Sequence, residues 1–260
     1  MKKLIIVAAT CMLTSNAGAQ FTRLVWADEF NYTGLPDSTK WNYATGSSGW
    51  GNNELQFYTL KRMENASVVN GVLTIKAIRE KYQGADYTSA RLTTKNKAAW
   101  KYGRIEVRAK LPAGKGVWPA IWMLSDNKTY GDWPRTGEID IMENVGYNPD
   151  SVFASIHTQA YNHTIGTQRT KGIARKDLSI AFHVYVLEWK EKKISIFIDS
   201  EKYFEFNNEG TGAAVWPFDK KFYLLLNIAV GGNWGGKMGV DDSIFPQEMQ
   251  IDYVRIYQKK

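Results

Sequence analysis

Three carboxylic acids lie close together in the segment 138–143, whose sequence is EIDIME. In an extended strand, Glu138 and Asp140 face the same side, because successive side chains alternate between the two faces. Glu143 lies five residues after Glu138, so a regular strand would turn it toward the opposite, apolar face, where an unpaired carboxylate is costly. One extra residue in the strand, a β-bulge, restores the alternation. We therefore predict a bulge near positions 141–142 that turns all three acids to one face.

Two glutamates at this spacing are suited to the hydrolysis of a glycosidic bond. With the bulge, Glu138 and Glu143 are separated like residues i and i+4 of a strand, so their Cα atoms lie about 13 Å apart. If each side chain leans inward, the carboxyl groups come within roughly 5–6 Å, which matches a retaining glycosidase better than an inverting one. One carboxylate must be ionised to attack, and the other must hold a proton for the leaving oxygen. Asp140 lies between them and can share a proton or hydrogen-bond the nucleophile, since like charges resist joint ionisation.

Two other interpretations use the same acids: a solvated acidic strand and a calcium-binding site. A solvated strand would not need the break in alternation or the apolar residues between the acids, so we favour catalysis over these interpretations. The ten tryptophans of the chain agree with a sugar substrate. Several of them are expected to fill the core, but a flat indole also stacks on the apolar face of a pyranose ring.

The elements that must position the acids are predicted to be strands. Alternating or continuously apolar patterns indicate strands over 104–111, 182–189, 193–199, 222–230 and 249–257. Asn70-Gly71 joins two β-rich runs, which predicts a hairpin. No long segment has the 3.6-residue period of a helix. We predict an all-β fold, an antiparallel sandwich or jelly roll, in one domain over 20–260. The long loops 45–56, 80–88 and 231–247 are expected to form the rim of a binding site.

The beginning of the chain is typical of a secretory signal peptide, which we place at residues 1–19. It has a basic start, a short apolar run and a small-residue end at Ala17-Gly18-Ala19. The apolar run is too short to span a bilayer, and no later stretch approaches 18 apolar residues, so we expect no membrane partner. The single cysteine, Cys11, lies in this leader, and the rest of the chain therefore has no disulfide. We expect a secreted, extracellular or periplasmic, monomer.

The charge distribution argues against nucleic-acid binding. The formal net charge is +7, from 33 Lys and Arg against 26 Asp and Glu, but no block of basic residues occurs. We therefore expect a polysaccharide partner and no nucleic acid. The positive net charge would also suit an acidic polysaccharide.

The acidic motif and its surroundings resemble glycoside hydrolase family 16. The segment EIDIME has the family's signature in its bulged form, and the other matching stretches resemble the laminarinase branch, the endo-β-1,3-glucanases. The resemblance extends over nearly all of the chain after the leader, and the matching stretches are WADEF at 26–30, GWGNNELQ at 49–56, WPAIWML at 118–124, NIAVGGNW at 227–234 and DYVR at 252–255.

The resemblance implies a β-jelly roll of two curved sheets with a substrate cleft on the concave face. It implies that Glu138 is the nucleophile, that Asp140 assists it, and that Glu143 is the acid/base. It also implies a set of sugar-binding residues. These are Asn52, Trp118, Trp122, Trp133 and His157.

The resemblance further implies a structural calcium ion on the convex face. Its ligands would be Glu29, the carbonyl of Gly71 and Asp252, a set of hard oxygen donors of the kind that Ca²⁺ prefers. The ion would stabilise the fold and take no part in the reaction. We expect no redox or organic cofactor.

We predict a secreted retaining endo-β-1,3-glucanase of the laminarinase type. One alternative is the same chemistry on another polysaccharide, namely mixed-linkage β-1,3-1,4-glucan, agarose, porphyran or carrageenan. Another alternative is a jelly-roll lectin without catalytic activity, which would keep the tryptophans but would not need all three acids.

Overall fold

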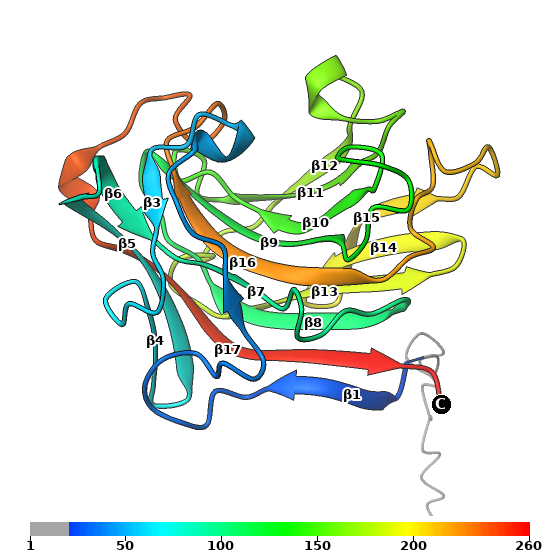
Figure 1. Cartoon of the computed structure of the whole chain (residues 1–260), viewed down its shortest axis with the longest axis horizontal. Helices are drawn as coiled ribbons and strands as arrows, with labels where there is room; N and C mark the ends of the chain where they lie inside the picture. Colours follow the sequence, from blue (N-terminus) through cyan, green and yellow to red (C-terminus); the bar gives the residue numbers. More distant parts are fainter. Residues whose placement is uncertain (1–20) are drawn as a thin grey trace, which may run out of the picture.

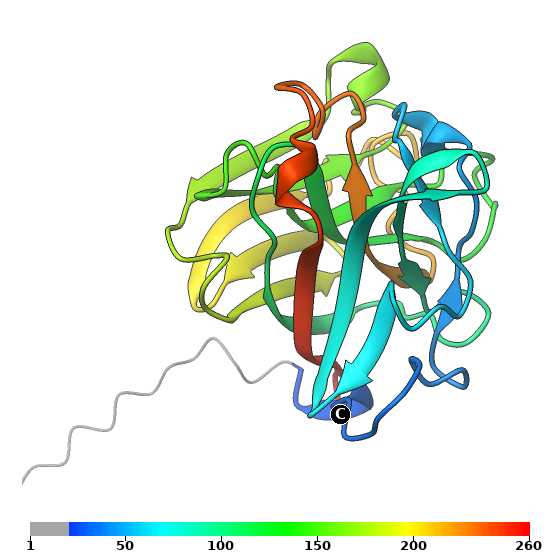
Figure 2. The same ribbon diagram turned by 90° about the vertical axis from the view of Figure 1, so that its left-hand side faces the viewer.

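The computed structural model describes residues 21–260, so the predicted leader lies outside the described residues. Two β-sheets stack face to face, and both curve in the same direction (Figures 1 and 2). We refer to them as the inner sheet, which holds the acidic segment, and the outer sheet. Among the described residues, no helix is long and apolar enough to cross a membrane.

The inner sheet has seven strands, all paired antiparallel. In spatial order they are β12 (Arg169–Ala174), β11 (Ser151–His157), β10 (Glu138–Glu143), β9 (Val117–Ser125), β16 (Phe222–Val230), β7 (Arg91–Thr93) and β2 (Asn42–Tyr43).

The outer sheet has ten strands. Eight of them follow one path: β15 (Glu201–Asn207), β14 (Lys193–Ile198), β13 (His183–Lys190), β8 (Gly103–Lys110), β17 (Gln247–Gln258), β5 (Val72–Tyr82), β6 (Ala85–Ser89) and β3 (Gln56–Tyr58). Off this path, β1 (Arg23–Asp28) pairs with β17, and β4 (Ala66–Val69) pairs with β5. Three short 3-10 helices lie in the loops: η1 (Gly49–Gly51), η2 (His163–Ile165) and η3 (Asp242–Ile244).

The strands predicted from the alternation patterns are confirmed. All five predicted segments lie on strands, namely β8, β13, β14, β16 and β17. The predicted hairpin joins β4 and β5, with positive φ angles of 52° at Asn70 and 79° at Gly71. Both angles are needed in a type I′ turn, which Asn-Gly favours.

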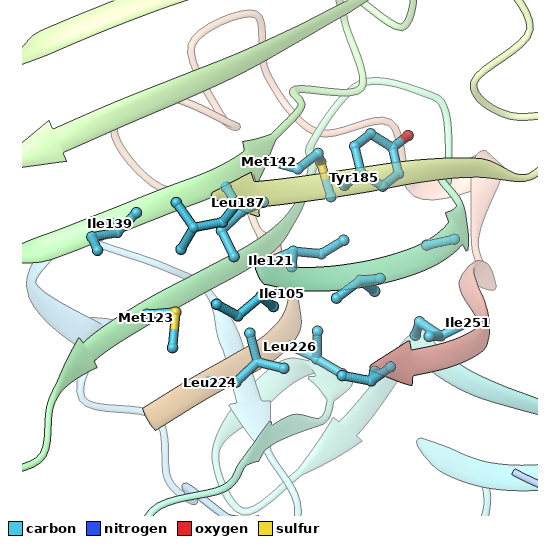
Figure 3. Close-up of a cluster of buried hydrophobic side chains, with 14 of the residues drawn as sticks. Ile105, Ile121, Met123, Ile139, Met142, Tyr185, Leu187, Leu224, Leu226 and Ile251 are labelled. Carbon is cyan, nitrogen blue, oxygen red and sulfur yellow. The ribbon is translucent and has the colours of Figure 1, made fainter. Parts of the chain in front are cut away.

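The core between the two sheets holds the acidic strand in place. On β10, Ile139 and Met142 lie in this core near Tyr185 and Leu187 of β13 in the opposite sheet (Figure 3). All four side chains are fully buried, and each such burial contributes about 1.5–3 kcal/mol to folding. All nine residues of β16, which lies two strands away in the same sheet, are also buried.

Candidate active site

The predicted bulge is present in β10. Toward β9, Asp140 pairs with Trp122 and Met142 pairs with Ile121, so Ile141 is the additional residue. The pairing with β11 shifts over the same stretch. Glu138, Asp140 and Glu143 consequently line one cleft.

A tyrosine from the opposite sheet satisfies the bulged residue. The hydroxyl of Tyr203, on β15, donates a hydrogen bond of 2.9 Å to the carbonyl oxygen of Ile141. Tyr203 is only 3% exposed, so water cannot easily take its place. A buried carbonyl without a partner would cost about 1–3 kcal/mol, and this bond therefore stabilises the bulge that orients the acids.

The cleft crosses the inner sheet and has a volume of about 710 Å³. Its lining comes from strands β7, β16, β9, β10, β11 and β12, together with loops around them. On β9, Trp118 and Trp122 face the cleft while Ile121 and Met123 are fully buried in the core, which is the alternation of a strand with two different faces.

A histidine contacts two of the acids, Glu138 and Asp140, and a tryptophan contacts Glu138. The indole N–H of Trp133 donates to Glu138 Oε2 at 2.9 Å. His157 Nε2, on β11, lies 3.3 Å from Asp140 Oδ2 and 3.9 Å from Glu138 Oε1. His157 is 6% exposed, so the site holds this ring in place beside the carboxyl groups.

The third acid, Glu143, is held at both oxygens. Trp118 Nε1 donates to Oε1 at 3.0 Å, and Ser155 Oγ lies 3.5 Å from Oε2. The two glutamates therefore resemble each other in one respect, since each accepts a hydrogen bond from an indole N–H. They differ in their second partner, which is His157 for Glu138 and Ser155 for Glu143.

All three acids bind protons more tightly than isolated carboxyl groups. Burial and the charge of Asp140 raise the pKa of Glu138 from 4.5 to about 8. Burial also raises the pKa of Asp140. Burial and the charge of Asp140 raise the pKa of Glu143 well above its ordinary value. The cluster can therefore hold a proton on one carboxyl group near neutral pH while another is ionised, as an acid and a nucleophile require.

The predicted sugar-binding residues all meet in this cleft. Asn52, Trp118, Trp122, Trp133 and His157 belong to its lining. Trp122 is fixed by a 2.8 Å hydrogen bond from its Nε1 to Asn227 Oδ1 of β16. The structure thus brings the three acids and the five predicted sugar-binding residues to one place, and their roles remain predictions.

An arginine that was not predicted from the sequence lies in the same cleft. The guanidinium of Arg91 lies between the rings of Trp50 and Trp122, 4.6 Å from each ring centroid. Its Nε is buried without a hydrogen-bond partner among the described residues. No local pattern marks Arg91, because both stacking partners are distant in the chain.

Trp234 was also missed as a site residue, although it closes one of the matching stretches. It lines the cleft and packs edge-on against Trp118 at 5.5 Å and against Phe153 at 5.2 Å. This tryptophan extends the aromatic wall beyond Trp118, on the side of Glu143.

The comparison with protein families identifies the family of the chain. The model for glycosyl hydrolases family 16 matches residues 53–255. The chain belongs to glycosyl hydrolase family 16. A beta-glucanase from Rhodothermus marinus is 54% identical over 242 residues, which is 90% of this chain and 85% of that protein.

Solved structures of family 16 enzymes superpose closely on the chain. The laminarinase from Rhodothermus marinus has a TM-score of 0.90 at 54% identity and covers 92% of this chain and 98% of its own. SCLam, a non-specific endo-beta-1,3(4)-glucanase, has a TM-score of 0.88 at 47% identity and covers 92% and 91%. The predicted all-β jelly roll and the predicted family are confirmed.

The rim of the family 16 cleft differs in part from the prediction. The loops 45–56 and 231–247 contribute Trp50, Asn52 and Asn233, as expected. The prediction for 80–88 is wrong, because these residues form the end of β5, the turn after it and most of β6, and they do not line the cleft. The loops that follow β9 and β11 contribute to the lining in its place, with Lys128 and His163 among their residues.

The three predicted calcium ligands are neighbours on the outer sheet. Ile251 of β17 pairs with Leu73 of β5, so Asp252 lies close in register to Gly71. Asp28 pairs with Val254, which brings Glu29 to the same region.

Both of the carboxylates in this predicted set are held by arginines. Arg255 binds the two oxygens of Glu29 at 2.8 Å each, and Arg108 binds Asp252 Oδ2 at 2.6 Å. The donor types fit Ca²⁺. Glu29, however, would have to exchange its arginine for the ion, whereas Asp252 has a second oxygen to offer.

Proposed function

We propose that this member of family 16 is an endo-β-1,3-glucanase that cleaves laminarin-type glucans by double displacement. The observation that carries the proposal is the bulge at Ile141, which turns Glu138 and Glu143 into one aromatic-lined cleft. The names of the similar proteins, a beta-glucanase and a laminarinase from Rhodothermus marinus, support the substrate class.

In the first step, Glu138 attacks the anomeric carbon and forms an ester bond to the sugar. The glycosidic bond breaks, and its electron pair goes to the leaving oxygen, which takes the proton of Glu143. The indole N–H of Trp133 holds the Glu138 carboxylate at 2.9 Å and orients it for the attack. Ionising Glu138 also becomes easier when Asp140 beside it keeps its proton, since two adjacent negative charges repel.

In the second step, the Glu143 carboxylate takes a proton from water. The resulting hydroxide oxygen attacks the anomeric carbon, and the ester bond to Glu138 breaks, which restores both glutamates. Two inversions at one carbon retain the anomeric configuration. The indole N–H of Trp118 donates a hydrogen bond of 3.0 Å to Glu143 and keeps this carboxyl group in place through both steps.

The reaction is tested with laminarin as substrate. Wild type should release reducing ends, and proton NMR during early hydrolysis should show the β-anomer first. Glu138→Ser should lose this activity and still bind laminari-oligosaccharides in calorimetry. Absence of hydrolysis by wild type with binding intact would favour a lectin, and an initial α-anomer would exclude double displacement.

A broader glucan specificity is the second candidate. SCLam, 47% identical, is a non-specific endo-beta-1,3(4)-glucanase. A parallel reducing-sugar assay on lichenan separates the two, because a strict β-1,3-glucanase leaves the mixed-linkage polymer largely intact. Agarose, porphyran and carrageenan complete the screen, and faster turnover of any of them would replace laminarin as the substrate.

We also propose that Glu29, Gly71 and Asp252 bind a structural calcium ion. The ion would join strands β5 and β17 to the segment after β1, so it should raise the melting temperature without changing turnover at low temperature. Melting with CaCl₂ and with EDTA tests this, and Asp252→Asn should remove the difference. Equal melting temperatures in both solutions for wild type would exclude the site.

Secretion and the monomeric state are proposals as well. The basic start and small-residue end of segment 1–19 support export. Mass spectrometry of the protein recovered outside the cytoplasm should show cleavage after Ala19. Light scattering should give a mass slightly below the 29.5 kDa of the full chain.

A further inference from the structure

We propose that Ser155 and Thr170 form a hydroxyl pair that positions Glu143 and adapts to its protonation state. This inference rests on the proposed function, in which Glu143 serves first as acid and then as base. Ser155 lies on β11 and Thr170 on β12, and both line the cleft. Neither residue carries chemistry of its own in the mechanism above, so the pair acts through the carboxyl group.

The hydrogen bond from Trp118 determines which oxygen of Glu143 carries the proton. An indole N–H can only donate, so Oε1, which accepts it at 3.0 Å, must offer a lone pair. The carbonyl oxygen of a neutral carboxyl group accepts hydrogen bonds better than its hydroxyl oxygen, so this bond favours Oε1 as the carbonyl and Oε2 as the protonated oxygen. Ser155 Oγ is the partner of this second oxygen, at 3.5 Å. Hydrogen bonds of catalytic groups are often long in a structure without substrate, and shorten when substrate binds.

Ser155 can serve both protonation states because a hydroxyl both donates and accepts. Its Oγ lies 3.0 Å from Thr170 Oγ1, and either atom can be the donor. When Glu143 is neutral and no substrate is bound, Oε2 donates to Ser155, and Ser155 donates to Thr170. When the leaving oxygen has taken the proton, Ser155 turns and donates to the new carboxylate, while Thr170 donates to Ser155.

The hydroxyl pair carries no charge, whereas several other groups around Glu143 are titratable. Glu138 and Asp140 come from the same strand, His157 from β11, and Tyr203 lies beneath from β15. Burial and the charges of Asp140 and Glu138 favour the protonated acid. A hydroxyl that donates to the ionised form opposes this trend without adding a charge, and so stabilises the transition state in which Glu143 becomes negative.

Removing the Ser155 hydroxyl should shift the pKa of Glu143 in one direction. Without Ser155, the ionised form of Glu143 loses a hydrogen bond, and its pKa rises. The basic limb of the pH profile of kcat/KM, where the acid loses its proton, should then move to higher pH. The rate at the optimum should fall about 10- to 100-fold, the effect of losing a hydrogen bond to a charged group.

The experiment compares two leaving groups. Ser155→Ala should lower kcat on laminari-oligosaccharides with little change in KM. It should leave kcat/KM for 2,4-dinitrophenyl β-laminaribioside near that of wild type, because dinitrophenolate leaves without a proton. Equal losses on both substrates, or an unchanged rate and pH profile on the oligosaccharide, would overturn the proposal.

A second pair of variants keeps the test valid if Ser155→Ala does not fold. Thr170 lies on the exposed edge strand β12, so Thr170→Val should fold, and it removes the hydroxyl while keeping the shape. Thr170→Val should be several-fold slower on oligosaccharides, and Thr170→Ser should match wild type. Equal rates of Thr170→Val and Thr170→Ser would contradict the proposal that the two hydroxyls act together. Failure of the proposed function would look different, since wild type itself would then release no reducing ends.

Discussion

Acidic side chains occupy opposite electrostatic surroundings on the two sheets. On the outer sheet, the hydrogen bonds from Arg255 lower the pKa of Glu29. On the inner sheet, burial raises the pKa of Glu138 and Glu143, and among the described residues His157 is the only basic side chain within 4 Å of the three acids. The same functional group is thus neutralised by cations on one sheet and left without them on the other.

This difference explains why only one of the sheets can support the reaction. A carboxylate that is already paired with arginine is a weak nucleophile and holds no proton to give. The unpaired inner acids retain both abilities, but burying them costs stability. The jelly roll tolerates this cost because the centre of its inner sheet is well packed, with all nine residues of β16 buried.

The largest difference in kcat is expected between a substitution of an acid on the inner sheet and a substitution of an acid on the outer sheet. Glu138→Gln should lower kcat on laminarin at least about 10³-fold, since the proposed nucleophile is lost. Glu248→Gln, on the outer sheet, removes the partner of Lys76 and should leave kcat unchanged. Steady-state kinetics on both purified variants makes the comparison, and comparable losses would show that the two sheets do not differ as described.

The unfolding free energy of Glu138→Gln should depend less on pH than that of wild type. The unfolded chain releases the Glu138 proton near pH 4.5, whereas the folded protein keeps it to about pH 8. This contribution to stability is therefore complete below pH 4.5 and is lost as the pH rises to 8, with a slope of up to about 1.4 kcal/mol per pH unit. Urea unfolding at pH 4.5, 6 and 8 should show a smaller decline for Glu138→Gln than for wild type.

A smaller effect on catalysis is expected from the tyrosine beneath the bulge. Tyr203→Phe leaves the Ile141 carbonyl without its partner, which should lower the unfolding free energy by about 1–3 kcal/mol. It should also lower kcat about tenfold or more, because the carboxyl groups lose their alignment.

Tyr185 provides the matched control for this substitution. It is also fully buried, but its hydroxyl has no hydrogen-bond partner in the described part of the chain. Tyr185→Phe should therefore be neutral or stabilising and should keep full activity. If both variants behave alike in unfolding and in turnover, the bond to Ile141 does not support the site.

Trp133→Phe is expected to act mainly through pH. Burial and the charge of Asp140 raise the pKa of Glu138, while His157 and the indole N–H of Trp133 oppose them. Removing the N–H should raise this pKa further, so the acidic limb of the kcat/KM profile should move to higher pH. The loss should be greatest at low pH, up to about tenfold at pH 6, and should disappear only when the pH exceeds the raised pKa of Glu138. A uniform loss across the profile would mean that Trp133 only contacts the sugar.

The smallest effect is expected on the stability of the outer sheet. The Lys76–Glu248 pair is about one third exposed at each side chain, and such pairs contribute about 0–1 kcal/mol. Thermal unfolding of Glu248→Gln should therefore differ little from wild type, and less still at high salt. A loss above 2 kcal/mol would mean that outer-sheet ion pairs are a major source of stability.

The sequence was sufficient to predict the strands and the acidic face, because both depend on local alternation. The bulge could be predicted for the same reason, since Glu143 falls at the wrong parity relative to Glu138. Arg91 and Tyr203 could not be predicted, as neither lies in a marked motif. Each acts through partners that are distant in the chain, and only the stacking of the sheets brings them together.

The cleft runs across the sheet from Arg91 on β7 to Thr170 on β12. Five interstrand steps of about 4.8 Å make a trough about 24 Å long. A polymer can lie in such a trough by any interior stretch, with both of its ends far from the protein. Cuts should therefore fall throughout the polymer, and the viscosity of a glucan solution should drop long before much free sugar accumulates.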